Sequence, residues 1–233
     1  MDNNAEHPSN NTLHQAAMPE RVLLICDGLL QINADFFDVH LNKLLNELES
    51  VLFKNAESHK HDVMQGEHLT SLRNLKRTRY DFIPRFLAAV EHHIANIRPI
   101  TSATQIQHDQ KTTSNYELHL LEHHASDEDQ IQFEITSRCE SQNSFDIFQL
   151  GQRFGVLAGK PAFEADKLPI GPKIFSKCLQ ESIQALDLAL VDKRQVYILF
   201  ERYVLTHFSI LLDSCNHFLI ENGVLPNLSY VPF

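Results

Sequence analysis

The last third of the chain contains two runs of apolar residues spaced by three and four positions, each bounded by residues that start or stop helices. Gly171 and Pro172 open the first run, because a proline in the first helical turn loses no backbone hydrogen bond. The second run begins at Asp192, with Gln195 as the other half of a capping box, and stops at Gly223. The pattern predicts two amphipathic helices, of which the second has about 30 residues and extends ~45 Å.

The same helical spacing continues through the first half of the chain. Asn33 is a good N-cap residue, and the apolar positions after it predict a helix that ends near Asn55. A second periodic region runs from Leu69 to Ile94 and contains Pro84. Because a proline inside a helix removes one backbone bond and crowds the preceding turn, this region forms either two helices end to end or one kinked helix. We favour the kinked helix.

Two further helices are predicted before the last third of the chain. Ser126 is followed by three acidic residues, which favours a helix that starts there and runs to about Glu140. Ser144 opens the next helix, and Gly159 closes it. Together these elements predict an all-α protein, a multi-helix bundle of about six helices with a long C-terminal helix.

Changes in composition indicate how the chain is divided. Residues 1–33 are expected to form a flexible N-terminal tail and lead-in, because their first part is rich in Asn, Ser, His and Pro. Residues 34–97 are expected to form an N-terminal helical pair, and the polar residues 98–115 a surface loop that marks a boundary. Residues 116–233 then form a C-terminal helical bundle, which can also pack with residues 34–97 as one domain.

Charge, hydropathy and cysteine content limit the class of protein. The net charge of −10 argues against a nucleic-acid-binding protein, which needs a surplus of Lys and Arg to meet phosphates. No apolar run approaches the roughly 18 residues of a membrane span, and no N-terminal signal sequence is recognised. The four cysteines form no CxxC pair, which indicates reduced thiols. We therefore expect a cytoplasmic protein without a membrane span or a nucleic-acid partner.

Motifs for catalysis and cofactor binding are missing, apart from one string that resembles a metal site. The sequence has neither a G-x-S-x-G motif nor a glycine-rich phosphate loop, so no catalytic residue and no cofactor are predicted. His119, Glu122 and His123 match the H-x-x-E-H signature of inverted zinc peptidases. Such a site needs both histidines on one helical face, whereas the helix-start signals come later, at Ser126. We interpret the string as a chance match and predict no metal ligand.

Two other groups of histidines lack the spacing and the carboxylate neighbours of a catalytic site. They are His92 with His93, and the group of His59, His61 and His68. Both groups are interpreted as exposed polar residues. Since histidine titrates at about pH 6.5, they predict some pH dependence of solubility or association.

A basic cluster within the region that contains Pro84 is the strongest candidate for a binding site. It consists of Arg73, Lys76, Arg77 and Arg79. On a helical wheel Arg73 and Arg77 share one side, whereas Arg79 falls among apolar residues, where an unpaired charge is costly. One hypothesis is that Arg79 is partly buried and paired to an acidic residue of a neighbouring helix. The other is a patch that binds an anion on a protein, a nucleotide or a polar lipid.

Several segments of the chain together resemble a known family. The strongest are LPIGPKIFSKCLQESIQAL, at residues 168–186, and RQVYILFERYVLTHFSILLDSCNHFLIENGVLP, at residues 194–226. Upstream, residues 68–86 resemble the basic helix of the family, and residues 118–138 and 150–159 resemble its middle section. These segments are similar to the bacterial family catalogued as domain of unknown function 1631. Because members are typically several times longer, the chain resembles their N-terminal portion or a shortened member.

The resemblance implies a fold rather than an activity. Some relatives carry the label thymidine phosphorylase, but a phosphorylase needs a glycine-rich anion site, and no two glycines here lie closer than four positions apart. The chain also departs from the family pattern at Pro84 and in the histidine-containing residues 118–124.

The predicted function is that of a non-catalytic helical module with a regulatory or scaffolding role in a bacterial protein. It would act through protein–protein interaction, with a separate partner or with the remainder of a longer parent chain, and a homo-oligomer is compatible with the sequence. The alternative is a sensing module that binds an anionic nucleotide-type ligand at Arg73, Lys76, Arg77 and Arg79. An enzyme, either a zinc hydrolase or a phosphorylase, is the third hypothesis.

Overall fold

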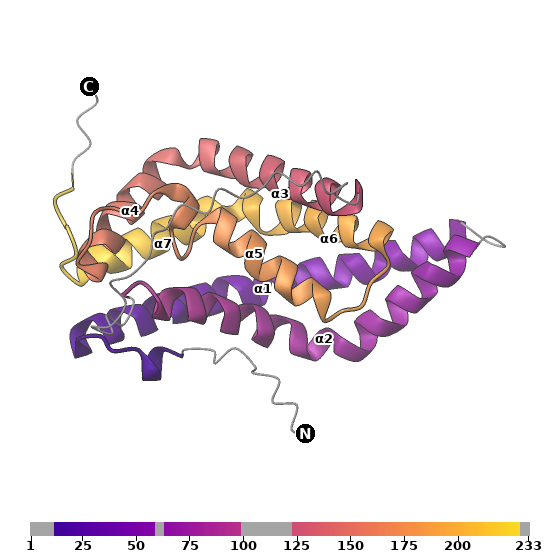
Figure 1. Ribbon diagram of the computed structural model, residues 1–233, viewed down its shortest axis with the longest axis horizontal. Helices are drawn as coiled ribbons and strands as arrows, with labels where there is room; N and C mark the ends of the chain where they lie inside the picture. The colour runs from indigo at the N-terminus through magenta and orange to yellow at the C-terminus, as the bar shows by residue number, and fades with distance from the viewer. Residues whose placement is uncertain (1–11, 59–62, 99–122, 229–233) are drawn as a thin grey trace, which may run out of the picture.

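The computed structural model describes residues 12–58, 63–98 and 123–228, and these residues form an all-α bundle (Figure 1). The α-helices are α1 Glu20–Ser58, α2 Val63–Ala95, α3 His123–Gln142, α4 Ser144–Ala158, α5 Pro172–Gln184, α6 Leu190–Tyr203 and α7 Phe208–Glu221. Short 3-10 helices are η1 Leu13–Gln15, η2 Ala165–Lys167 and η3 Leu205–His207. The elements α6, η3 and α7 follow one another as a C-terminal helix of 32 residues, so the predicted fold class is confirmed.

Helix α1 begins at Glu20, well before Asn33, the predicted N-cap residue. Ile25, Leu29, Asn33, Phe37 and Leu41 recur every four residues and are all buried, so Asn33 holds an inward position within the helix. Its side-chain amide donates a hydrogen bond to the carbonyl oxygen of Leu29, at 2.8 Å. The N-cap prediction was therefore wrong, because a buried Asn that bonds its own helix resembles a cap in sequence.

Helix α2 continues through Pro84, so the alternative of two separate helices is wrong. Figure 1 shows that the ribbon of α2 changes direction along its length. A bend of this kind is expected where a proline removes a backbone hydrogen bond from the helix interior. The predicted kinked helix agrees with this structure.

The predicted helix ends around α4 and α5 are confirmed, whereas two helix starts differ. Gly159 ends α4 with a φ of 65°, a left-handed conformation that glycine adopts without strain, and Pro172 lies in the first turn of α5. Helix α3 begins at His123 rather than at Ser126. Helix α6 begins at Leu190, which places Asp192 inside the helix, so the predicted capping box was wrong.

The helices pack as one bundle around a long antiparallel pair. Helices α1 and α2 form this pair, α5 packs on α2, and both α6 and α7 pack on α1 (Figure 1). Helix α4 packs on α7, and α3 packs on α5 and α6. The hydrophobic core contains residues from both of the predicted segments, 34–97 and 116–233.

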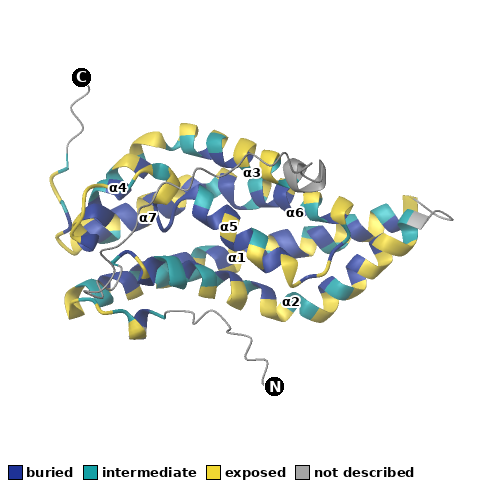
Figure 2. Cartoon of the chain, viewed as in Figure 1, coloured by how far each residue is buried: buried dark blue, intermediate teal, exposed yellow. Residues whose placement is uncertain are grey.

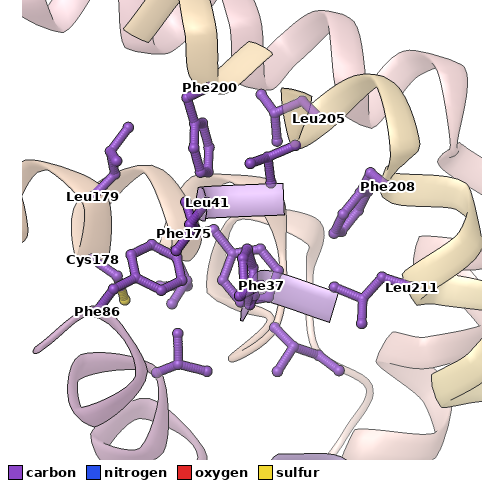
Figure 3. Packing of buried hydrophobic residues seen from close by; sticks show 14 of the residues in the cluster. Phe37, Leu41, Phe86, Phe175, Cys178, Leu179, Phe200, Leu205, Phe208 and Leu211 are labelled. Carbon is purple, nitrogen blue, oxygen red and sulfur yellow. The ribbon is translucent and has the colours of Figure 1, made fainter. Parts of the chain in front are cut away.

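Five helices meet at an aromatic core (Figure 3). Phe37 of α1 contacts Phe86 of α2 and Phe175 of α5, with ring centroids 4.6 Å and 4.8 Å apart. The ring centroid of Phe86 lies 6.4 Å from that of Phe200 of α6, and the ring centroid of Phe175 lies 6.0 Å from that of Phe208 of α7. All five rings are fully buried, and tilted or edge-to-face pairs of this kind add stability beyond the apolar area that they bury. Phe37 therefore joins the first half of the chain to the second.

The four cysteines are buried and free, as the sequence predicted. Burial raises the pKa of Cys26, Cys139 and Cys215 to about 12 and also raises the pKa of Cys178. Because these pKa values lie well above neutral pH, the thiols stay protonated. Since the thiolate is the nucleophilic form, the four cysteines are unreactive at neutral pH. Their environment is that of core residues.

Candidate functional site

The basic face of α2 is the outward surface formed by Leu69, Arg73, Lys76, Arg77 and Tyr80. These positions are spaced by three and four residues, which places them on one side of the helix. The opposite side of α2 packs on α1 and α5, and η1 packs against α2 as well. Figure 2 shows α2 along the outer edge of the bundle, with exposed residues on its outward side.

Arg73 and Arg77 form the centre of the basic face. They are exposed and lie one helical turn apart, and neither has an ion-pair partner within the part of the chain that the structure describes. Tyr80 is 86% exposed and Leu69 is 41% exposed, so aromatic and aliphatic surface flanks the two guanidinium groups. The basic face thus places two arginines that have no ion-pair partner among the described residues beside exposed apolar surface.

The other two predicted site residues contact α1. Lys76 Nζ lies 3.0 Å from Glu49 Oε1, and Arg79 Nη1 lies 3.5 Å from the second oxygen of Glu49. Arg79 also donates a hydrogen bond of 2.6 Å to the side-chain oxygen of Asn46. The prediction that Arg79 is partly buried and paired to an acid of a neighbouring helix is confirmed. Arg79 therefore attaches α2 to α1, and Lys76 is at the edge of the basic face.

A buried polar pair joins α2 to α6. His68 Nδ1 of α2 is 2.7 Å from Asp192 Oδ1 of α6, and the two side chains are 2% and 0% exposed. The interpretation of His68 as an exposed polar residue was wrong, and Asp192 faces the core instead of capping α6. The spacing of His68 from buried Leu72 and Leu75 was the sequence signal for an inward position. Nothing in the sequence indicated its partner, which is distant along the chain.

The connection between α5 and α6 is fastened to α2 next to this pair. Asn74 donates a side-chain hydrogen bond of 2.9 Å to the carbonyl oxygen of Asp187, and the amide of Ala189 donates one of 3.0 Å to the hydroxyl of Ser71. Asp187 has a φ of 49°, which is uncommon for a residue with a side chain. Residues of both segments, including Thr70 of α2, line a cavity of about 680 Å³. These hydrogen bonds hold the segment between α5 and α6 against α2.

The remaining histidine predictions have mixed outcomes. His119 and Glu122 lie outside the described residues, and His123 is the first residue of α3. The structure, over the residues that it describes, has no group of three His, Cys, Asp or Glu side chains placed to hold a metal ion. His92 and His93 are half-buried rather than exposed, and burial, together with the neighbouring His92, lowers the pKa of His93.

His59 and His61 also lie outside the described residues, so the structure says nothing about their predicted exposure. Among the helices that the structure describes, none has an apolar stretch long enough to cross a bilayer. This result agrees with the hydropathy of the sequence.

Comparison with known proteins identifies a family and no relative of established activity. The sequence matches, over residues 23–223, the family described as protein of unknown function (DUF1631) N-terminal domain. No curated protein and no solved structure matches the chain. The match covers α1 to α7 almost completely, including the basic face of α2. The chain therefore belongs to the DUF1631 family and corresponds to its N-terminal domain.

Proposed function

We propose that this protein is a non-catalytic docking module that binds an acidic protein partner through the basic face of α2. The observation that carries the proposal is the combination of Arg73 and Arg77, exposed and without an ion-pair partner in the described bundle, with Tyr80 at 86% exposure on the same face. A regulatory or scaffolding role in the cytoplasm of a bacterium fits this activity.

The residue types on the basic face are those that contribute most to protein interfaces. Arginine and tyrosine are enriched among residues whose removal costs the most binding energy, because they combine large contact area with hydrogen bonding. Two arginines one turn apart can each hold a carboxylate through paired N–H donors. A partner helix with acidic side chains at the same spacing would match Arg73 and Arg77, while its apolar side chains contact Tyr80 and Leu69.

The charge of the rest of the chain restricts an acidic partner to the basic face of α2. The protein has a net charge of −10, so an acidic partner is repelled by most of its surface and attracted only where cations gather. Such an arrangement supplies specificity and orientation more than raw affinity. It also makes the interaction sensitive to salt.

Buried polar groups support the non-catalytic part of the proposal. His68 and Asp192 have the residue types of a catalytic dyad, but both are closed off from solvent at 2% and 0% exposure. The cysteine thiols are buried, with raised pKa values. A substrate cannot reach these groups in the described bundle without opening it. Their arrangement supports the fold instead.

Charge reversal at the basic face is expected to weaken binding of an acidic helical peptide with glutamates four residues apart. The double variant Arg73→Glu and Arg77→Glu should lower affinity at least tenfold, which is about 1.4 kcal/mol, because two attractive pairs become repulsive. Fluorescence anisotropy at low ionic strength measures the change. Both residues are exposed, so the fold should be retained.

The matched control is Arg194→Glu with Arg202→Glu, two exposed arginines of α6. This variant carries the same change in net charge and should keep the affinity within about threefold. Equal losses in the two double variants would show that only overall charge matters and would refute the proposal. Selective loss of nucleotide binding, with peptide binding unchanged, would favour the sensing hypothesis instead.

A further inference from the structure

A second cavity lies on another part of the bundle, between α3, α4 and residues 162–165. Its volume is about 690 Å³, and it is separate from the basic face of α2. Its apolar walls include Phe163 and Ile147, and serine hydroxyls of α3 and α4 contribute polar groups. The charged residues among the described residues of its lining are Glu140 and Glu164, which are both acidic.

Glu140 differs from other polar side chains around the cavity because part of its carboxylate is buried without a donor. Within the described residues, its Oε1 atom has no hydrogen-bond partner, whereas Glu164 is paired with Lys167 at 3.0 Å. Burial raises the pKa of Glu140, nearby Lys173 opposes this shift, and Asp166 adds to it. A buried carboxylate oxygen without a donor costs free energy, so a donor that a ligand brings to the Glu140 carboxylate would be favourable.

The two oxygens of Glu140 belong to one delocalised carboxylate. A donor in the cavity that contacts the second oxygen therefore also offsets the negative charge that buried Oε1 shares. Glu140 itself lines the cavity, on the side formed by α3. The carboxylate is thus a built-in acceptor next to an apolar wall.

The cavity wall formed by residues 162–165 is held close to α4 at a glycine. The amide of Phe163 donates a 3.1 Å hydrogen bond to the carbonyl oxygen of Gly151, and a Cβ atom on Gly151 would lie 2.4 Å from the carbonyl oxygen of Phe163. The ring of Phe163 also packs edge-to-face on Phe154, with centroids 6.2 Å apart. The aromatic wall is therefore fixed in place before any ligand arrives, which reduces the entropy cost of binding.

We propose that this cavity binds the guanidinium group of an arginine side chain presented by a partner protein. A guanidinium is planar and offers a fork of N–H donors that matches a carboxylate, and it stacks on aromatic rings. Glu140 would accept the donors, while Phe163 contacts the flat face and Ile147 the aliphatic stem. The acidic lining selects against an anionic segment. This binding site is independent of the proposed function at α2.

The test uses N-acetyl-arginine amide as the probe and the neutral isostere N-acetyl-citrulline amide as its control. In an NMR titration up to about 50 mM, the arginine probe should give saturable shifts at Phe163 and Ala165, and the citrulline probe should not. Glu140→Gln should weaken the arginine probe at least tenfold, because the charge-assisted hydrogen bonds are lost. The thermal stability of the Glu140→Gln variant should not fall, since Oε1 of Glu140 has no hydrogen-bond partner among the described residues.

Glu134→Gln is the matched control variant on the same helix. Glu134 is exposed and bonds only Gln130 of its own helix among the described residues, so this change should leave binding of the arginine probe intact. The proposal is overturned if the arginine probe shows no saturable binding, if the citrulline probe binds equally well, or if Glu140→Gln binds as tightly as the natural protein. None of these outcomes bears on the basic face of α2.

Discussion

Replacing Phe37 with alanine is expected to lower the free energy of unfolding by about 3 to 5 kcal/mol. Phe37 is fully buried and contacts Phe86 and Phe175, so its removal leaves a cavity where α1, α2 and α5 meet. The loss combines the transfer energy of a large apolar side chain with the cost of the cavity. Chemical denaturation followed by far-ultraviolet circular dichroism measures it.

The matched control is Phe53→Ala in the same helix. Phe53 is 52% exposed, so its removal should cost less than about 1 kcal/mol. A comparable loss for the two variants would contradict the assignment of Phe37 to the aromatic core. A small loss at Phe37 alone would show that the neighbouring rings collapse into the vacated space.

Replacing His68 with alanine is expected to cost about 3 kcal/mol of stability, the second large effect. In the natural protein Asp192 Oδ1 is 2.7 Å from His68 Nδ1, and Oδ2 is buried without a partner in the described residues. Removing the imidazole leaves both carboxyl oxygens buried and unpaired. A buried polar group without its partner incurs its full desolvation penalty.

A double-mutant comparison separates this penalty from lost packing. The variant with His68→Leu and Asp192→Leu removes both polar groups at once and should recover at least half of the stability that His68→Ala loses. Chemical denaturation of the single and double variants gives the comparison. A double variant that is less stable than His68→Ala would contradict this account. It would mean that the His68–Asp192 contact itself adds to the free energy of unfolding, beyond preventing an unpaired buried carboxyl group.

Local helix signals predicted the C-terminal elements well because they depend on backbone chemistry alone. A proline in the first turn of α5 and a left-handed glycine after α4 act within a few residues, and both predictions are confirmed. The same local signals led to two wrong N-cap predictions, at Asn33 and at Asp192. Each has a side chain that caps helices, but each lies on the buried side of its helix and bonds elsewhere. Tertiary packing, which the local signals do not encode, places both side chains in the interior of the bundle.

The candidate site was predictable in part. A helical wheel placed Arg73 and Arg77 together on one side and Arg79 among apolar neighbours, which the structure bears out in the pairing of Arg79 with Glu49. The identity of Glu49, and the unpaired oxygen of Glu140, depend on segments far apart in the sequence. No periodicity carries that information. The exposure of Tyr80 likewise follows only once the neighbours of α2 are known.

Site-specific photo-crosslinking at Tyr80 tests the central claim most directly. A photoreactive phenylalanine analogue at position 80 lies on the basic face, whereas the same analogue at Ile210 lies on α7, where the natural side chain is 56% exposed. In bacterial extract, position 80 is predicted to give a defined crosslinked partner that disappears when an acidic helical peptide is added or when Arg73 and Arg77 are changed to Glu. Position 210 should not give this product. Equal crosslinking at both positions, or a product at position 80 that survives the charge reversal, would contradict the assignment of α2 as the docking surface.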